Sequence, residues 1–320
     1  MMTTEINLHS VSELDEAIAS GGFSALVEKC ERQHTERIAR IAELIASRVP
    51  AVRLVLEAGP SAAGKTTTAI RLCHALEKNG LTALRISTDD YFVGDARNPR
   101  DAEGKLDYEH FGAVDRTRLA EDLLKIFDGE PLHRRKFDFV KHEGFDDPEV
   151  FVPPPNVVVV LEGIHALNPA LTEGVPDEFK YRVYVNTLTQ LVADCGGWLY
   201  FEDARLMRRI VRDKTYRDMS PETTIKMWEK VSAGEMRWIN PYRGFADSVF
   251  NTALDYELAV MKPILEPVMR AVPYLGGRES AEIRRLLAVL DTIVAVDDIS
   301  SIPGDSILRE SIGGSHFDYV

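Results

Sequence analysis

The sequence predicts an α/β fold of three layers, in which helices cover both faces of a mainly parallel sheet. Short apolar segments alternate with amphipathic helices along most of the 320 residues, as in sheets whose parallel strands are joined by helical crossovers. Residues 157–161 form an unbroken apolar run, which is typical of a strand covered on both faces. A glycine-containing turn at residues 59–64 separates an alternating apolar segment from a helix.

A helical arm is expected before the first strand. Ser10 and Glu13 have the spacing of a capping box, and Gly21-Gly22 should end the first short helix. Apolar residues then recur at helical spacing as far as Pro50. We therefore divide the chain into an N-terminal helical arm, an α/β domain and a C-terminal tail, at residues 1–50, 51–300 and 301–320.

The α/β domain should contain at least five short strands and five helices. The expected strands are 52–56, 81–87, 157–161, 181–185 and 248–250, with a further strand or hairpin arm at 131–140. The expected helices are 65–78, 115–127, a long one from about 203, 254–270 and 280–290. We find no internal repeat and no low-complexity tract in the sequence.

The composition is that of a globular protein with an acidic surface. Hydrophobic residues make up 45% of the chain, and 38 Lys and Arg against 51 Asp and Glu give a net charge of −13. This charge argues against nucleic acid or an anionic membrane as the main partner, because both require a positive face. The sequence also shows neither an apolar stretch of about 20 residues nor a secretory leader pattern, so we expect a cytoplasmic protein.

The three cysteines suit a reducing compartment. Cys30, Cys73 and Cys195 are widely spaced and form no C-x-x-C pair. Their odd number and spacing predict neither a disulfide framework nor a zinc site.

Residues 59–66 read G-P-S-A-A-G-K-T and match the phosphate-loop (P-loop) pattern G-x-x-x-x-G-K-[ST]. Glycines let the backbone curl so that successive N–H groups point at phosphate oxygens, and the dipole of the following helix adds to the attraction. Lys65 can reach the β- and γ-phosphates, and the Thr66 hydroxyl can take a position on Mg²⁺. The candidate nucleotide-binding residues are Gly59, Ser61, Ala62, Ala63, Gly64, Lys65, Thr66 and Thr67.

Two carboxylates follow expected strands and point to chemistry at the phosphate. Asp89 lies just after the strand at 81–87, where it can orient and deprotonate an attacking hydroxyl or hold Mg²⁺ through water. Glu162 ends the apolar run at 157–161, and the carboxyl end of a central strand faces the ligand crevice of an open α/β sheet. Glu162 is therefore a candidate direct or indirect partner of Mg²⁺.

Four arginines at i, i+3, i+4 and i+7 lie on one face of the helix that begins near residue 203: Arg205, Arg208, Arg209 and Arg212. Such a stripe could be a solvated face that pairs with the excess carboxylates. It could also bind a triphosphate, because guanidinium groups match phosphate geometry and stabilise charge in a transferring group.

Taken together, these segments resemble the uridine kinase/phosphoribulokinase family of P-loop kinases. The matching segments occur in the family's order, span about residues 52–250, and are 59–67, 87–92, 106–110, 137–142, 161–164 and 203–213. The resemblance implies a nucleoside kinase-like P-loop NTPase fold with a helical lid at about residues 203–240. It also implies an enzyme that uses ATP and Mg²⁺ to phosphorylate the 5′-hydroxyl of a pyrimidine ribonucleoside.

The resemblance further implies roles for individual residues. Asp89 would be the base that faces the acceptor hydroxyl, with Lys65 and the lid residues Arg209 and Arg212 completing the catalytic group. Arg217, beyond the lid helix, would bind the nucleotide. The substrate would contact Asp89, Tyr91, Asp107, Phe137 and His142, with Asp107 on the ribose hydroxyls and Phe137 and His142 near the base. Thr66 and Glu162 would lie at Mg²⁺.

Two positions depart from the pattern of typical uridine kinases. Arg217 is retained after the lid helix, but a second arginine of that motif is absent at 218–219. Phe137 stands where the family usually has a tyrosine, which removes a hydroxyl group from the base side.

The later part of the chain is similar to a bacterial subgroup of uridine kinase-like nucleoside kinases. Trp228, Glu235, Trp238 and the tail segment 302–310 carry this second resemblance. The tail is interpreted as a docked peptide or an interface element, with no chemistry assigned to it. The family also leads us to expect that a homo-oligomer is possible.

Three functions stay open at this point. The first is a kinase of uridine or cytidine. The second is a P-loop kinase of another alcohol, such as a phosphorylated sugar, glycerate or pantothenate, for which residues 133–136 offer a cluster of cations. The third is a regulator that binds ATP without catalysis, although such a protein has no need of a positioned base.

Overall fold

A parallel sheet of five strands forms the centre of the computed structural model, which describes residues 7–193, 199–274 and 276–319. The strand order is β2 (Ala83–Ser87), β5 (Val158–Glu162), β1 (Leu54–Ala58), β6 (Lys180–Asn186) and β7 (Ser248–Asn251). All four neighbouring pairs run parallel. The predicted α/β class and the mainly parallel sheet are therefore confirmed.

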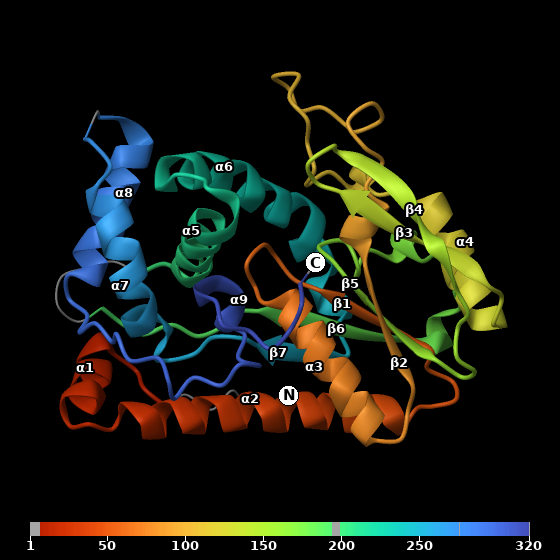
Figure 1. Cartoon of the computed structure of the whole chain (residues 1–320), viewed down its shortest axis with the longest axis horizontal. Coiled ribbons are helices and arrows are strands. Elements are labelled where there is room, and N and C mark those ends of the chain that lie inside the picture. Colours follow the sequence, from red (N-terminus) through yellow and green to blue (C-terminus); the bar gives the residue numbers. More distant parts are fainter. Residues whose placement is uncertain (1–6, 194–198, 275, 320) are drawn as a thin grey trace.

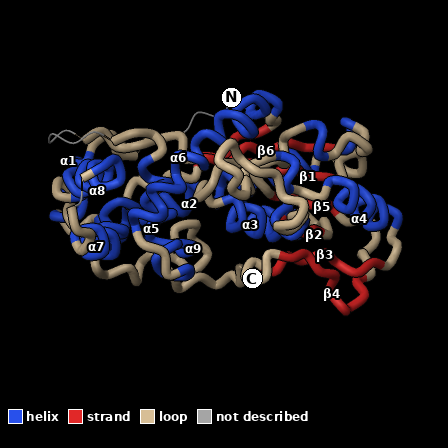
Figure 2. The backbone as a smooth tube through the Cα atoms, turned by 90° about the horizontal axis from the view of Figure 1, so that it is seen from above, coloured by secondary structure: helices blue, strands red, loops and turns tan. Residues whose placement is uncertain are grey.

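Helices and a hairpin cover the two faces of the sheet. Alternate strand residues, such as Val55 and Val160, face a core shared with α2 (Phe23–Ala46) and α3 (Lys65–Lys78). Their strand neighbours, such as Leu56 and Leu161, face the core of α4 (Arg116–Asp128). The antiparallel hairpin β3 (Leu132–Asp138) and β4 (Glu143–Phe151) lies at the edge of the molecule, outside the five-stranded sheet (Figure 2).

A second group of helices forms a lobe beside the sheet. This helical lobe consists of α1 (Val11–Ala19), α5 (Asp203–Arg217), α6 (Pro221–Gly234), α7 (Glu257–Arg270) and α8 (Gly277–Leu290). It has an apolar core of its own, to which the first half of α2 contributes Leu26, Val27 and Cys30. Figure 1 shows α2 running beneath both the sheet and the lobe. The N-terminal arm thus shares its apolar faces with both parts of the structure.

The beginning of the arm follows the sequence closely. The Ser10 Oγ atom accepts a hydrogen bond from the backbone N–H of Glu13 at 3.2 Å, and α1 begins at the next residue, Val11. Gly21 takes a φ of 76°, a left-handed conformation that an L side chain rarely adopts. The chain can therefore turn there before α2 begins.

Two elements have no counterpart in the expected strands and helices. The strand β4 is almost entirely exposed and reads E-G-F-D-D-P-E-V-F, so neither an apolar run nor an alternating pattern marks it. The helix α6 lies inside the predicted lid, where the sequence pattern predicted one long helix from about residue 203 and no separate second helix. Its N-cap is Ser220, whose hydroxyl accepts from the N–H of Thr223, and Pro221 occupies the first turn.

Cys30 and Cys73 are buried free thiols, and burial raises the pKa of each to about 12. Cys195 lies outside the described residues. Within the described part of the chain, no helix has both the length and the apolar character to cross a bilayer.

A buried ion pair joins α5 to α7. The Nε atom of Arg208 lies 2.5 Å from Oε2 of Glu257, and its Nη2 atom donates to the carbonyl oxygen of Thr252 at 2.7 Å. The side chains of Arg208 and Glu257 are only 2% and 4% exposed. Arg208 therefore belongs to the frame of the helical lobe.

Arg208→Leu should destabilise the fold strongly, because it leaves the Glu257 carboxylate buried without its cation. We expect a loss of about 3–5 kcal/mol in the free energy of unfolding, measured by urea denaturation. The matched control is Arg40→Leu, which removes an exposed pair with Glu43 on α2 and should cost less than about 1 kcal/mol. Equal shifts in the two variants would contradict a structural role for Arg208.

Candidate functional site

The phosphate-loop motif connects β1 to α3 and has the backbone geometry that its glycines predict. A Cβ atom on Gly59 would lie 2.0 Å from the carbonyl oxygen of Val185 in β6, so no side chain fits there. Gly64 has a φ of +81°, which favours glycine at the start of α3. Lys65 follows, and its Nζ atom donates to the carbonyl oxygen of Pro60 at 3.1 Å, across the loop. The backbone therefore forms a closed turn with its lysine folded over it.

The helix α5, which the resemblance predicts to belong to a lid, contacts this turn directly. The Nη1 atom of Arg209 donates to the Ser61 hydroxyl at 2.8 Å, and that of Arg205 lies 3.3 Å from the Ser61 carbonyl oxygen. Arg205 also pairs with Glu235 at 2.8 Å, beyond the end of α6. The structure thus brings Arg205 to the loop as well as the predicted Arg209.

One buried carboxylate pairs with three arginines of α5. Asp213 is fully buried and pairs with Arg209 at 3.2 Å, with Arg212 at 3.0 Å and with Arg217 at 3.4 Å. Burial lowers the pKa of Arg209 and of Arg217, because a charged guanidinium loses water there. Three cations share one anion, so positive charge is left in excess beside the phosphate loop.

Asp89 and Glu162 lie on the other side of the loop. Asp89 stands in a 3-10 turn (Thr88–Tyr91) directly after β2. The surrounding protein raises the pKa of its carboxyl group, while Lys65, Arg217 and Arg212 oppose that shift in this order. Arg212, a predicted lid residue, and Arg217, predicted to bind the nucleotide, therefore act together with the loop lysine on the predicted base.

Glu162 ends β5, as predicted, and is almost fully buried. Burial raises the pKa of its carboxyl group to about 7, with the negative charge of Asp89 adding to the shift and Lys65 opposing it. The Nη1 atom of Arg85 lies 3.5 Å from its Oε1 atom. Asp89 and Glu162 thus form an anionic edge next to the cations of the loop and lid.

Two further carboxylates reach this edge without having been selected from the sequence. Burial raises the pKa of Glu109 to about 7, and the positive charges of Arg209 and Lys65 oppose that shift. Glu57, in β1, is paired in register with Glu162, and burial raises its pKa well above the usual range. Within the described residues, neither Glu57 oxygen has a hydrogen-bond partner. Glu57 could have been selected from the sequence because it is a charged residue inside an otherwise apolar strand.

The predicted acceptor residues fall into two groups. Asp107 lies in the loop before α4, and its Oδ1 atom accepts from the backbone N–H of Glu109 at 3.1 Å. Tyr91 is buried, and its hydroxyl donates to Oδ2 of Asp122 in α4 at 3.1 Å. Asp107 is therefore hydrogen-bonded to the backbone of Glu109 at the site. The Tyr91 hydroxyl is instead hydrogen-bonded to α4.

The other two predicted residues belong to the β3–β4 hairpin. The Phe137 ring is buried against the rings of Phe92 and Phe139, with centroids 5.5 and 5.1 Å apart. His142 lies in the turn with a φ of 54°, and its Nδ1 atom is 2.9 Å from the hydroxyl of Tyr108. Phe137 thus forms part of an aromatic wall that includes Tyr108 through Phe92, and the Tyr108 hydroxyl faces His142.

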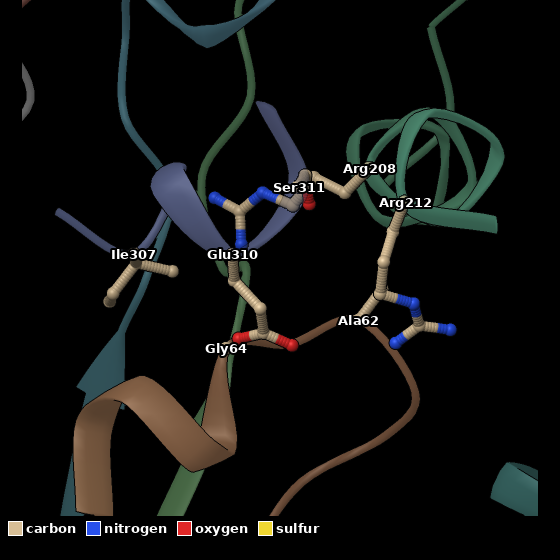
Figure 3. A pocket seen from close by; sticks show the side chains of 7 residues that line it. All are labelled: Ala62, Gly64, Arg208, Arg212, Ile307, Glu310 and Ser311. Atoms are coloured by element: carbon tan, nitrogen blue, oxygen red, sulfur yellow. The ribbon is translucent and has the colours of Figure 1, made fainter. Parts of the chain in front are cut away.

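The C-terminal tail reaches the same place from a distant part of the sequence. A small cavity lies between the phosphate loop, the lid helix α5 and the short helix α9 (Arg309–Ile312) (Figure 3). Its lining residues are Ala62, Gly64, Arg208, Arg212, Ile307, Glu310 and Ser311. The tail was interpreted as a docked peptide or an interface element, and no pattern in it indicated the phosphate loop as its location.

The site offers few protein ligands to a metal ion. Within the residues that the structure describes, no group of three or more His, Cys, Asp or Glu side chains could hold one. Mg²⁺ bound to nucleotides usually takes one or two protein ligands, with phosphate and water oxygens completing its shell. Thr66 and Glu162, on the loop and at the anionic edge, fit that requirement.

Several known proteins are similar to this chain. A uridine kinase of Deinococcus deserti is 28% identical over 193 residues, which cover 60% of this chain and 84% of that protein. A uridine kinase of Staphylococcus carnosus is 27% identical over 193 residues, covering 60% and 83%. Among solved structures, a D-glycerate 3-kinase from Cryptococcus neoformans aligns with a TM-score of 0.45 and 14% identity over 68% of this chain and 95% of its own.

The sequence model of one family covers most of the sheet and lid. The model of the Phosphoribulokinase / Uridine kinase family matches residues 55–259, from β1 into α7. This span contains the phosphate loop, the anionic edge and the arginines of the lid. The chain therefore belongs to the phosphoribulokinase/uridine kinase family and is an ATP-dependent small-molecule kinase.

Proposed function

We propose that the protein transfers the γ-phosphoryl group of ATP to the 5′-hydroxyl of a pyrimidine ribonucleoside, uridine or cytidine. The observation that carries this proposal is the position of Asp89, which lies beside Glu162 in the anionic edge and is acted on by the cations Lys65, Arg217 and Arg212. The similarity to uridine kinases over most of their length supports the acceptor class.

Asp89 is proposed as the general base. As the acceptor oxygen bonds to the γ-phosphorus, its proton passes to the Asp89 carboxylate, and the bond from the γ-phosphorus to the bridging oxygen breaks to release ADP. Desolvation raises the pKa of the Asp89 carboxyl group, and the positive charges of Lys65, Arg217 and Arg212 oppose that shift. A positioned carboxylate of this kind contributes typically 10²–10⁴-fold to a proton-transfer step.

The loop and the lid are proposed to hold the phosphates. Backbone N–H groups of the turn, Lys65 and the lid arginines would neutralise the charge that spreads over the transferring group. Because Asp213 holds Arg209, Arg212 and Arg217 together, these cations are oriented before the nucleotide binds. Mg²⁺, held by Thr66 and near Glu162, would supply further charge neutralisation between the phosphates.

The acceptor is proposed to lie between the anionic edge and the hairpin. Asp107 would accept hydrogen bonds from ribose hydroxyls, because an ionised carboxylate accepts and does not donate. Phe137 and His142 would face the base, with Tyr91 supporting the wall behind them. The hydroxyl of Tyr108 adds a polar group beside His142.

A phosphorylated acceptor would need a cation cluster of its own, and residues 133–136 were the candidate. In the structure these side chains are engaged within the hairpin or next to it. The Arg134 guanidinium stacks on the Phe151 ring, Arg135 lies 3.4 Å from Asp146, and Lys136 lies 3.6 Å from Asp90. This arrangement favours an uncharged acceptor such as a nucleoside.

The third possibility, an ATP-binding regulator without catalysis, is less well supported. Lys65, Thr66, Asp89 and Glu162 stand together around one turn, and a protein that only binds ATP needs no base beside the γ-phosphate. The acceptor assay below tests this alternative together with the others.

Asp89→Asn should reduce kcat by about 10²–10⁴-fold, because the amide keeps the shape of the side chain but cannot take up the proton. Initial rates of ADP release at saturating ATP and acceptor measure the effect. The control is Asp90→Asn, which changes the neighbouring carboxylate that faces Lys136 and should keep most of the activity. Full turnover by Asp89→Asn would refute its role as base.

Arg212→Gln should reduce kcat by about 10³-fold, because an arginine that stabilises the transferring phosphoryl group has this order of effect. Its stability should change by no more than about 1 kcal/mol, since Asp213 keeps Arg209 and Arg217 as partners. The control on the same helix is Lys214→Gln, which removes an exposed cation paired with Asp218. If activity falls only in proportion to the folded fraction, Arg212 is structural.

ADP release from ATP and Mg²⁺ across several acceptors tests the acceptor class. We expect turnover with uridine or cytidine, and none with ribulose 5-phosphate, glycerate or pantothenate. Lys65→Ala and Asp89→Asn should abolish the signal, which excludes a contaminating kinase. Turnover only with a non-nucleoside would move the acceptor to another alcohol, and ATP binding without any turnover would favour the regulator.

A further inference from the structure

The C-terminal tail, residues 302–319, is placed against the phosphate loop by several independent contacts. The Oε2 atom of Glu310 accepts from the hydroxyl of Thr67 at 3.1 Å, and the hydroxyl of Tyr319 also lies 3.1 Å from the Thr67 hydroxyl oxygen. A Cβ atom on Gly64 would lie 2.4 Å from Cγ2 of Ile307. The tail thus sits on the loop and on the first turn of α3, although the family match ends at residue 259.

The tail is held in this position by its own framework. The guanidinium of Arg309 donates to the carbonyl oxygens of Ile299, Ile302 and Gly313. The backbone N–H of His316 donates to the carbonyl oxygen of Gly304 at 2.8 Å, which closes the tail into a loop. Because these three carbonyl oxygens hold Arg309 in place, the next residue, Glu310, is directed at the phosphate loop.

The strand order indicates which end of a bound nucleotide would meet the tail. The anionic edge follows β2 and β5, which lie on one side of β1, whereas β6 and β7 lie on the other. Figure 1 shows α9 on the side of β6 and β7, between α5 and α3. A donor that directs its γ-phosphate toward Asp89 must leave the loop on the opposite side. Its nucleoside part is then directed toward Glu310.

The charge of Glu310 indicates which group it would contact. Figure 3 shows the Glu310 carboxylate and the Arg212 guanidinium directed at the loop segment that carries Ala62 and Gly64. A carboxylate repels phosphate, so the phosphates belong to Lys65 and the lid arginines. With one oxygen on Thr67, the other can accept from hydroxyl groups, and the ribose is the part of a nucleotide that offers hydroxyls next to its phosphates.

We propose that the C-terminal tail forms one wall of the donor-nucleotide site and that Glu310 binds the ribose hydroxyls of the donor. This inference rests on the proposed function only in taking the loop as the donor site. It does not depend on which acceptor is phosphorylated. The tail would thereby be a part of the nucleotide site that this chain adds to the family's phosphate loop.

Calorimetric titration of the full chain with ATP, 2′-deoxy-ATP and inorganic tripolyphosphate, each with Mg²⁺ and without acceptor, tests this proposal. Glu310→Ala should bind ATP about 10-fold or more weakly than the native chain does, because the variant loses a hydrogen bond to a charged group. The same variant should lose less affinity for 2′-deoxy-ATP than for ATP, because 2′-deoxy-ATP lacks one of the two ribose hydroxyls that Glu310 would bind. Tripolyphosphate should bind equally well or more tightly, because the variant removes a negative charge.

Two further variants keep the test interpretable. Glu310→Gln retains an acceptor oxygen for Thr67. It should lose less ATP affinity than Glu310→Ala, and its thermal unfolding should match that of the native chain. Asp305→Ala removes a negative charge from the same tail and should leave the preference for ATP over tripolyphosphate unchanged.

Other outcomes would overturn the proposal in distinguishable ways. Tighter binding of all three ligands by Glu310→Ala would make the tail an inhibitory cover of the loop. Equal affinities in native and variant chains would make its contact with Thr67 structural only. If the native chain binds ATP with the expected pattern but phosphorylates no nucleoside, the proposed function fails while this inference stands. If it binds neither ATP nor tripolyphosphate, both fail.

Discussion

The pairing of three arginines with the single buried carboxylate of Asp213 determines the organisation of the site. Guanidinium groups this close repel one another, and burial adds the cost of removing them from water. One fully buried anion offsets both effects, but it cannot neutralise three cations. The positive charge that remains lies over the turn between β1 and α3. A polyphosphate is an anion that matches it in charge and in geometry.

The contacts of α5 connect this charge to the fold. Arg208, on the adjacent face of the helix, is committed to Glu257 and fixes α5 against α7. Arg205 and Arg209 reach Ser61 and fix the other face against the phosphate loop. Helix α5 is therefore in contact with the loop, and Asp213 keeps its cations assembled. Such assembly reduces the reorganisation that phosphate binding requires.

The parts of this arrangement that are local in sequence could be predicted. The phosphate loop, the carboxylates after β2 and β5 and the helical spacing of the arginines all lie within short segments whose pattern carries the chemistry. Strand β5 was predicted because its apolar run is buried on both faces, whereas β4 was missed because its exposed side chains follow no apolar pattern. The sequence spacing placed four arginines on one stripe. It could not show that Arg208 meets a glutamate 49 residues away.

Contacts between distant segments depend on the strand order, which the sequence did not supply. Glu57 and Glu162 become neighbours only because β1 and β5 pair in parallel. Thr67 and Glu310 are 243 residues apart and meet because the tail returns past the helical lobe to the loop. Both meetings place a carboxylate beside a phosphate-binding turn, but in different surroundings. Glu57 is buried beneath the loop, whereas Glu310 lines a cavity above it with Arg212.

That difference separates the possible roles of the two groups. A buried carboxyl group without a hydrogen-bond partner is stable mainly in its neutral form, and burial together with Glu162 raises the pKa of Glu57 accordingly. Glu310 shares a cavity with Arg212 and accepts a hydrogen bond from the Thr67 hydroxyl, so it has partners where Glu57 has none. An ionised carboxylate at the mouth of a phosphate site repels one end of a nucleotide and can accept hydrogen bonds from the next part of it. The same charge would therefore help to fix the direction in which a donor lies along the loop.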